Sequence, residues 1–202
     1  MTSSINKGLI LFALLFLLWY VKPIYKKPVI IKNMLTHEEC DHIKNVASKR
    51  LSVSTVSEDR DVDTKVRQSE TAWIKPGEDK VVKKLMDKCL TNIDRPLENC
   101  EDLQVLKYKK GGFYNPHQDA FNNKNKRMYT FIIALNDDYE GGGTNFPNLN
   151  KTYKLKKGDS LFFNTLNNYE RIPRKALHGG LPVESGEKWI CNLWVHKHPY
   201  TV

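Results

Sequence analysis

The chain has 202 residues, of which 40% are hydrophobic, and it contains 4 Trp, 9 Tyr and 8 Phe. This length suffices for one domain with a sizeable core, and the composition excludes an intrinsically disordered chain. The formal net charge of +9 would suit an anionic partner, but no nucleic-acid-binding motif is present, so we expect no nucleic acid as a partner.

The N-terminal segment contains an uninterrupted apolar run from Gly8 to Val21. With its flanking residues the run reaches the roughly 20 residues that span a bilayer, and Lys7 and Lys22 would then lie at the two headgroup regions. A cleaved signal peptide has a similar apolar length, but no small-x-small cleavage pair follows the run. We therefore expect an uncleaved single-pass membrane anchor and linker over residues 1–27. A signal peptide and a buried core helix are the alternatives.

The first half of the remaining chain predicts short strands and two helices. Thr36 and Glu39 stand in the spacing of a capping box, which marks the start of a helix. The apolar spacing that follows is helical in both expected helices. The polar residues 51–70 predict a strand pair with a long mobile connection. Strands are expected over residues 28–32 and 71–74, and helices over 36–50 and 80–92.

From Leu103 onward the apolar pattern changes to that of short β-strands separated by Gly, Asn, Asp or Pro turns. Two helices followed by many antiparallel strands predict a mainly β domain with flanking α-helices. Its core would be a double-stranded β-helix, or jelly roll, over about residues 103–198, with the N-terminal helices packed on it. The expected strand segments are LQVLKY, MYTFIIAL, YKLKKGDSLFF, HGGLPV and KWICNLWVH.

The four cysteines show neither a CxxC motif nor zinc spacing. Cys191 lies in an apolar run and is expected to be a core thiol. A disulfide between Cys89 and either Cys40 or Cys100 would need an oxidising compartment, and spacing alone does not fix the pairing.

Candidate metal ligands occur at His117 and Asp119, which stand two positions apart. On an extended backbone such side chains point the same way, and a third ligand would complete a 2-His-1-carboxylate face for Fe(II). The candidates for that third ligand are His178, His196 and His198. His178 is flanked by small residues that leave room beside a metal. An HxD pair alone is a weak signal, because surface residues produce it by chance.

Several further motifs occur in a fixed order around these residues: RQSETAWI, LQVLKYKKGGFYNPHQD, EGGGTNFP, KKGDSLFF and LHGGLPVESGEKWICNLWVH. Together they resemble the prolyl 4-hydroxylase family of Fe(II)- and 2-oxoglutarate-dependent dioxygenases over about residues 28–196. The resemblance makes residues 28–202 the expected catalytic domain.

The resemblance also implies roles for individual residues. Lys188 suits its implied role physically, because a buried dianionic co-substrate needs a cation and this lysine opens an apolar run. The implied set is His117, Asp119 and His178 as iron ligands, Lys188 and Tyr108 as partners of the distal 2-oxoglutarate carboxylate, Thr144 and Trp194 as pocket-lining residues, and Arg127 as a basic residue near the substrate.

The implied reaction is hydroxylation of peptidyl proline to 4-hydroxyproline in a Pro-rich or collagen-like protein, with consumption of O2 and release of succinate and CO2. Ascorbate is the expected reductant. Related iron halogenases lack the carboxylate that Asp119 supplies here, so its presence favours hydroxylation. The alternatives are an oxygenase acting on a free amino acid or another small molecule, and a non-catalytic jelly-roll binding module.

Two further expectations concern the surroundings of the site. Residues 52–68 are a candidate lid, with a disordered surface loop as the alternative. Membrane-anchored members of the resembled family commonly face the endoplasmic reticulum lumen, so we expect a lumenal catalytic domain. The lysines that flank the apolar run lean slightly toward the opposite orientation.

Overall fold

The computed structural model describes residues 8–12, 15–16, 22–56, 62–91 and 93–201. Part of the predicted anchor and linker, at residues 1–7, 13–14 and 17–21, lies outside the described residues, while residues 8–12 and 15–16 are helical. No helix in the described ranges is long and apolar enough to cross a bilayer, so the predicted anchor is not supported.

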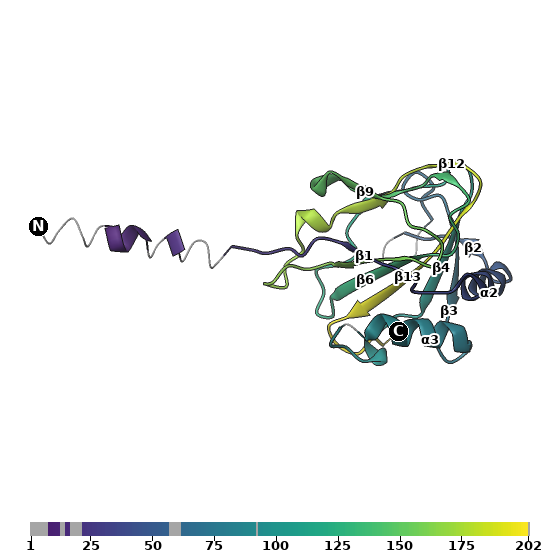
Figure 1. The fold of residues 1–202 in the computed structure, drawn as a ribbon, viewed down its shortest axis with the longest axis horizontal. Coiled ribbons are helices and arrows are strands. Elements are labelled where there is room, and N and C mark those ends of the chain that lie inside the picture. The colour runs from purple at the N-terminus through teal and green to yellow at the C-terminus, as the bar shows by residue number, and fades with distance from the viewer. Residues whose placement is uncertain (1–7, 13–14, 17–21, 57–61, 92, 202) are drawn as a thin grey trace, which may run out of the picture.

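The folded region is an antiparallel double-stranded β-helix, as predicted (Figure 1). Its major sheet consists, in spatial order, of β1 (Val29–Ile31), β10 (Ser160–Asn164), β6 (Arg127–Ala134), β13 (Lys188–His196), β4 (Leu103–Tyr108), β3 (Glu70–Ile74) and β2 (Ser52–Val53). Its minor sheet consists of β5 (Tyr114–His117), β11 (His178–Gly180), β8 (Thr144–Phe146) and β9 (Lys151–Tyr153). A separate two-stranded sheet pairs β12 (Val183–Ser185) with β7 (Glu140–Gly141).

Two helices, α2 (His37–Ser48) and α3 (Lys80–Leu90), pack on the major sheet (Figure 1). The predicted capping box is present at the start of α2, where Thr36 and Glu39 each bond the backbone N–H of the other. At α3, the carboxylate of Asp79 accepts from the N–H groups of Val81 and Val82. Both caps satisfy backbone donors that a first helical turn leaves unpaired. Three short 3-10 helices complete the elements: η1 (Leu97–Asn99), η2 (Pro147–Leu149) and η3 (Arg174–Ala176).

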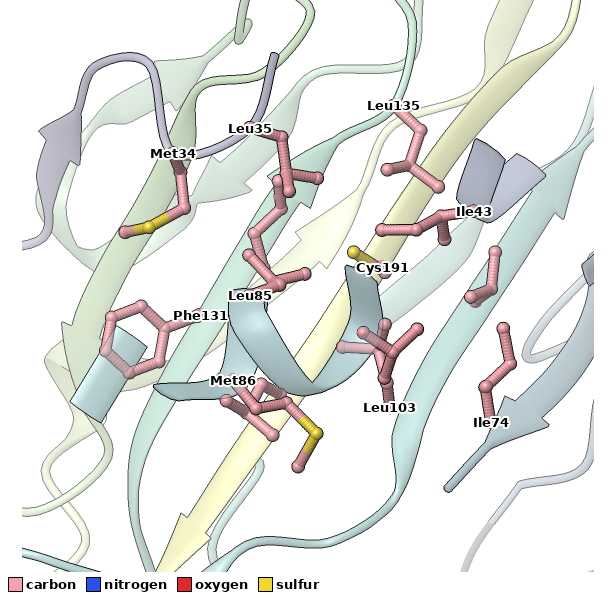
Figure 2. Packing of buried hydrophobic residues seen from close by; sticks show 14 of the residues in the cluster. Met34, Leu35, Ile43, Ile74, Leu85, Met86, Leu103, Phe131, Leu135 and Cys191 are labelled. Atoms are coloured by element: carbon pink, nitrogen blue, oxygen red, sulfur yellow. The ribbon is translucent and has the colours of Figure 1, made fainter. Parts of the chain in front are cut away.

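The central strands of the major sheet are buried on both faces, and strand alternation assigns each side chain to one of them. Figure 2 shows the face toward the helices, where Cys191, Leu103 and Phe131 pack with helix residues. Helix residues in this cluster include Ile43, Leu85 and Met86. The opposite face of the same strands forms one wall of a cavity between the sheets.

Two predicted strands are wrong in extent, because each is divided between two sheets. HGGLPV gives β11 in the minor sheet and β12 in the two-stranded sheet, and the chain leaves the ladder at Leu181-Pro182. Proline cannot donate to a ladder, which explains the break. YKLKKGDSLFF likewise gives β9 and β10, with a turn between them that contains Gly158 at a φ of 84°. The four cysteines are all free, so neither disulfide that spacing left open forms.

Candidate active site

A cavity of about 640 Å³ lies between the two sheets. Every second residue of β13 lines it: Lys188, Ile190, Asn192, Trp194 and His196. Because side chains of a strand alternate, these residues share the face opposite the helix-packed core. Successive members of the row stand roughly 6.6 Å apart along the strand, which orders the cavity from the Lys188 end to the His196 end.

Three candidate ligands meet in this cavity: His117, Asp119 and His178, called the metal group below. One ligand atom from each lies within 4.8 Å of the others, and in the described part of the chain this is the one such group of three. His117 Nε2 is 3.5 Å from Asp119 Oδ1, and His178 Nε2 is 3.6 Å from Asp119 Oδ2. The structure therefore brings together the three residues that the family resemblance selected.

Hydrogen bonds fix which nitrogen of each histidine faces the group. His117 Nδ1 lies 2.8 Å from the Asn115 carbonyl oxygen, and His178 Nδ1 lies 3.0 Å from that of Ala176. A carbonyl oxygen only accepts, so each Nδ1 carries a proton, and the neutral form of each ring presents the lone pair on Nε2. Two lone pairs and a carboxylate then converge, which is unfavourable without a cation between them.

Asp119 is buried, and its surroundings keep it ionised. Burial alone would raise the pKa of Asp119, but His178, His117 and Arg127 outweigh that effect and the pKa is lowered. Thr130 Oγ1 donates to Asp119 Oδ2 at 2.7 Å. Burial lowers the pKa of His178 to about 4, against an opposing effect of Asp119, so this ring is neutral near pH 7. Asp119 and His178 thus have the protonation that metal binding requires.

The backbone places the two histidines. β5 and β11 pair antiparallel with His117 directly opposite His178. Gly179 permits this approach, because a Cβ there would lie 2.8 Å from the Tyr114 carbonyl oxygen. Aromatic rings hold the imidazoles, with Tyr114 stacked on His117 at 3.7 Å between centroids and Phe146 stacked on His178 at 5.2 Å.

Lys188 is a buried cation at one end of the cavity. Its Nζ donates to the Gly142 carbonyl oxygen at 2.6 Å and lies 5.3 Å from the centroid of the Tyr108 ring. No carboxylate in the described ranges lies within ion-pair distance of this nitrogen. Burial lowers the pKa of Lys188 to about 8. Thr144 also lines the cavity, and Tyr108 is the strand partner of Lys188.

Arg127 lies toward the other end of the cavity. Its guanidinium forms a bidentate ion pair with the buried Glu101, and Nη1 donates to the Asp119 carbonyl oxygen at 3.3 Å. It also stacks over the Trp194 ring at 3.9 Å. Trp73, 44% exposed, lies 6.2 Å from Trp194 between centroids. Aromatic and basic groups therefore surround the metal group on the side away from Lys188.

The other two histidine candidates do not join the metal group. His196 lines the cavity, but its Nδ1 contacts the Asn125 carbonyl oxygen and its Nε2 contacts Glu101, each at 2.8 Å. His198 is exposed. Both were open alternatives on sequence alone, and neither is within reach of Asp119 as a ligand.

The candidate lid lies partly outside the described residues, at 57–61. Its described ends contribute Ser52, Val53, Thr55 and Arg67 to the cavity wall. Arg67 stacks over the Tyr114 ring at 4.6 Å, and Gln68 N–H bonds the Phe113 carbonyl oxygen at 2.9 Å. This position beside the cavity suits a lid, and closure remains a prediction.

Comparisons with known proteins show the family of the chain. A family model described as the 2OG-Fe(II) oxygenase superfamily matches residues 103–196. A putative prolyl 4-hydroxylase of Acanthamoeba polyphaga mimivirus is 34% identical over 189 residues, which cover 88% of this chain and 77% of that protein. Prolyl 4-hydroxylase 5 of Arabidopsis thaliana is 33% identical over 204 residues, covering 87% of this chain and 70% of that protein.

Among solved structures, the viral collagen prolyl hydroxylase of Paramecium Bursaria Chlorella virus-1, in complex with 2OG, matches with a TM-score of 0.71. It is 34% identical, and the match covers 85% of this chain and 96% of that one. The chain belongs to the prolyl 4-hydroxylase family of 2OG-Fe(II) oxygenases. It is an oxidoreductase of the procollagen-proline dioxygenase type.

The residues in the cavity of this prolyl 4-hydroxylase family member fit Fe(II) and 2-oxoglutarate, which the family uses. Two imidazoles and one carboxylate are a donor set suited to Fe(II) with positions left open. Lys188 supplies a buried positive charge without a carboxylate partner among the described residues, which suits a ligand carboxylate. The same cavity holds both features, so both groups can be accommodated together.

Three residues that line the cavity of this family member were given no role by the sequence. Tyr114 lies in the motif LQVLKYKKGGFYNPHQD. Glu101 precedes an apolar strand, and Thr130 lies within one. A polar residue at a cavity-facing position of a buried strand was the available signal for Thr130, which lies inside MYTFIIAL. The role of each appears only when the strands are paired.

Proposed function

We propose that this protein hydroxylates C4 of peptidyl proline in a Pro-rich or collagen-like chain. One molecule each of 2-oxoglutarate and O2 would be consumed per proline, and succinate and CO2 released. One arrangement carries the proposal: the Lys188 ammonium, which has no carboxylate partner among the described residues, shares a cavity with the three-ligand group of His117, Asp119 and His178. That combination suits a small dianion held between a metal and a cation.

In this proposal His117, Asp119 and His178 hold Fe(II), which supplies the oxygen-activating chemistry when bound. Lys188 neutralises the distal carboxylate of 2-oxoglutarate, and Tyr108 and Thr144 line the same end. Trp194 and Arg127 line the cavity away from Lys188, where a substrate would enter. The protein's own contribution is to orient both molecules and to exclude water from the reacting atoms.

The substrate assignment rests on the chain's family and on the wall of the cavity. Trp73, Phe121 and Trp194 line it. An aromatic-lined groove suits a Pro-rich segment, which arrives as a preformed polyproline helix. Ascorbate is proposed as an external reductant that keeps the iron ferrous, with no residue assigned to bind it.

The test is turnover with Fe(II), 2-oxoglutarate, ascorbate and a Pro-rich peptide, with succinate and 4-hydroxyproline measured in parallel. We expect both products in equal amounts, and neither from His178→Ala. Succinate formed without hydroxylation of any Pro-rich peptide would refute the peptidyl-proline assignment and leave an oxygenase of another substrate. Hydroxylation of free proline in preference to peptides would point to the small-molecule alternative.

A further inference from the structure

The segment after β13, residues 197–200, is fastened against the loop that follows Asp119. Asn125 makes most of these contacts. Its Oδ1 accepts from the His198 N–H at 2.9 Å, and its Nδ2 donates to the carbonyl oxygens of His198 and Pro199 at 3.3 and 3.1 Å. The Tyr200 N–H donates to the Glu98 carbonyl oxygen at 2.8 Å. Tyr200 is therefore held in place by its backbone.

Tyr200 is one of the residues that line the active-site cavity. Its ring stacks on His196 with 4.7 Å between centroids and 27° between planes. His196 cannot easily turn away, because Asn125 and Glu101 hold its two ring nitrogens. The half-buried tyrosine ring thus has a defined position, with one face used by His196.

Tyr200 lies beyond the metal group, on the side away from Lys188. Thr130, which bonds Asp119, is the strand partner of Trp194 on β13. His196 stands two residues farther along that strand, roughly 6.6 Å on, and Tyr200 stacks on it. A polyproline helix rises about 3.1 Å per residue, so for a peptide that lies along β13 this offset would correspond to about two substrate residues.

We infer that Tyr200 is a specificity-determining residue that packs against a proline about two positions from the hydroxylated one. The inference rests on the proposed function, because it takes a peptide as the substrate. A proline ring is flat, apolar and rigid, and an aromatic face is the surface that Pro-rich ligands commonly use. Trp73 and Phe121, which are 44% and 36% exposed, continue the aromatic rim of the cavity.

The experiment compares three peptides with wild-type protein and variants. One peptide carries proline at the second position on both sides of the target, and each of the others replaces one of these prolines with glycine. Wild type should show a KM about fivefold higher for one of the glycine peptides, the size expected for one aromatic contact. Tyr200→Ala should have this higher KM for all three peptides, with kcat and the KM for 2-oxoglutarate unchanged.

Further variants distinguish a direct contact between the Tyr200 ring and the peptide from an indirect role of Tyr200 in supporting His196. Tyr200→Phe keeps the ring and should restore the wild-type preference. Tyr169→Ala removes a tyrosine that is 40% exposed and does not line the cavity, and it should behave as wild type. If Tyr200→Ala does not fold, Tyr200→Leu provides the same comparison with an apolar side chain in place.

The outcomes distinguish this inference from the proposed function. If wild type hydroxylates none of the peptides, the proposed function fails, and the inference fails with it. If wild type hydroxylates all three with equal KM, only the inference fails. An equal loss of kcat on every peptide in Tyr200→Ala would show that the ring acts solely by supporting His196, which also overturns the inference.

Discussion

His117 and His178 are direct partners in the antiparallel pairing of β5 with β11, and the centroids of their rings lie 4.5 Å apart. The backbone ladder therefore sets the separation of two of the three proposed ligands. Asp119 follows His117 by two residues and is held by Thr130. A donor set built in this way is preorganised, because little rearrangement is needed when a metal binds.

The first prediction concerns the choice of histidine. His178→Ala should weaken metal binding by more than about 100-fold, exceeding the effect typical of residues that only support a ligand. Isothermal titration with Mn(II) or Co(II) measures this without turnover. His198→Ala is the matched control, because this exposed histidine contacts its neighbours through its backbone. Equal affinities in the two variants would remove His178 from the ligand set.

The second prediction tests the close approach of β5 and β11, the strands that carry His117 and His178. A Cβ at Gly179 would lie 2.8 Å from the Tyr114 carbonyl oxygen, whereas at Gly180 its nearest neighbour is 3.6 Å away. Gly179→Ala must push β11 from β5, and it should destabilise the protein by about 1–3 kcal/mol. Each kcal/mol lowers Tm by about 2–4 °C in a domain of this size.

Gly180→Ala supplies the comparison for this prediction, since it adds the same methyl group one residue away with ordinary van der Waals contacts. Thermal unfolding and Mn(II) affinity should be near wild type for Gly180→Ala and reduced for Gly179→Ala. Wild-type metal affinity in Gly179→Ala would show that strand separation does not control the ligand geometry.

Local features were predictable from the sequence because they depend on neighbours in the chain. The capping box of Thr36 and Glu39 needs residues three apart, and the alternation along β13 needs only the strand itself. His117 and Asp119 share a side for the same reason. The jelly roll followed from the order of these elements and from the family resemblance.

Features that depend on pairing between distant segments were not predictable from local patterns. Residue spacing left His178, His196 and His198 as candidates, with small neighbours and the family resemblance in favour of His178. The pairing of β5 with β11 is what brings His178 to Asp119. The division of HGGLPV between two sheets depends on where each half finds a partner. Apolar composition alone predicted an anchor that the described residues do not support.

The third prediction concerns the hydroxyl of Thr130, which donates to Asp119 Oδ2 at 2.7 Å in a buried setting. Thr130→Val keeps the shape and removes the donor, so one lone pair of the carboxylate loses its partner. Metal affinity should fall about 10–100-fold, as is typical when a support of a ligand is lost. Thr130→Ser keeps the donor and should stay close to wild type in the same titration. Equal affinities in all three proteins would show that Asp119 needs no such support.

The fourth prediction is a pH dependence of 2-oxoglutarate binding that arises from Lys188. Burial lowers the pKa of Lys188 to about 8. The charged form exists below that pH, and a dianion binds the charged form. The Kd for 2-oxoglutarate should therefore be flat below about pH 8 and rise above it by up to about tenfold per pH unit. Fluorescence or calorimetric titration of the Mn(II)-loaded protein without O2 measures this directly.

Two variants decide whether Lys188 is the group that titrates. Lys188→Met should bind 2-oxoglutarate at least about 30-fold more weakly, as expected when one partner of a buried charge pair is lost, and its Kd should not depend on pH around 8. Lys188→Arg keeps a charge that does not titrate in this range, so its Kd should also be flat but lower than that of the methionine variant. If Lys188→Met retains the wild-type rise above pH 8, another group is responsible and the neutralising role of Lys188 is refuted. The arginine variant separates charge from geometry, because any affinity it lacks relative to wild type at pH 7 reflects the fit of its larger head group beside Gly142 and Tyr108.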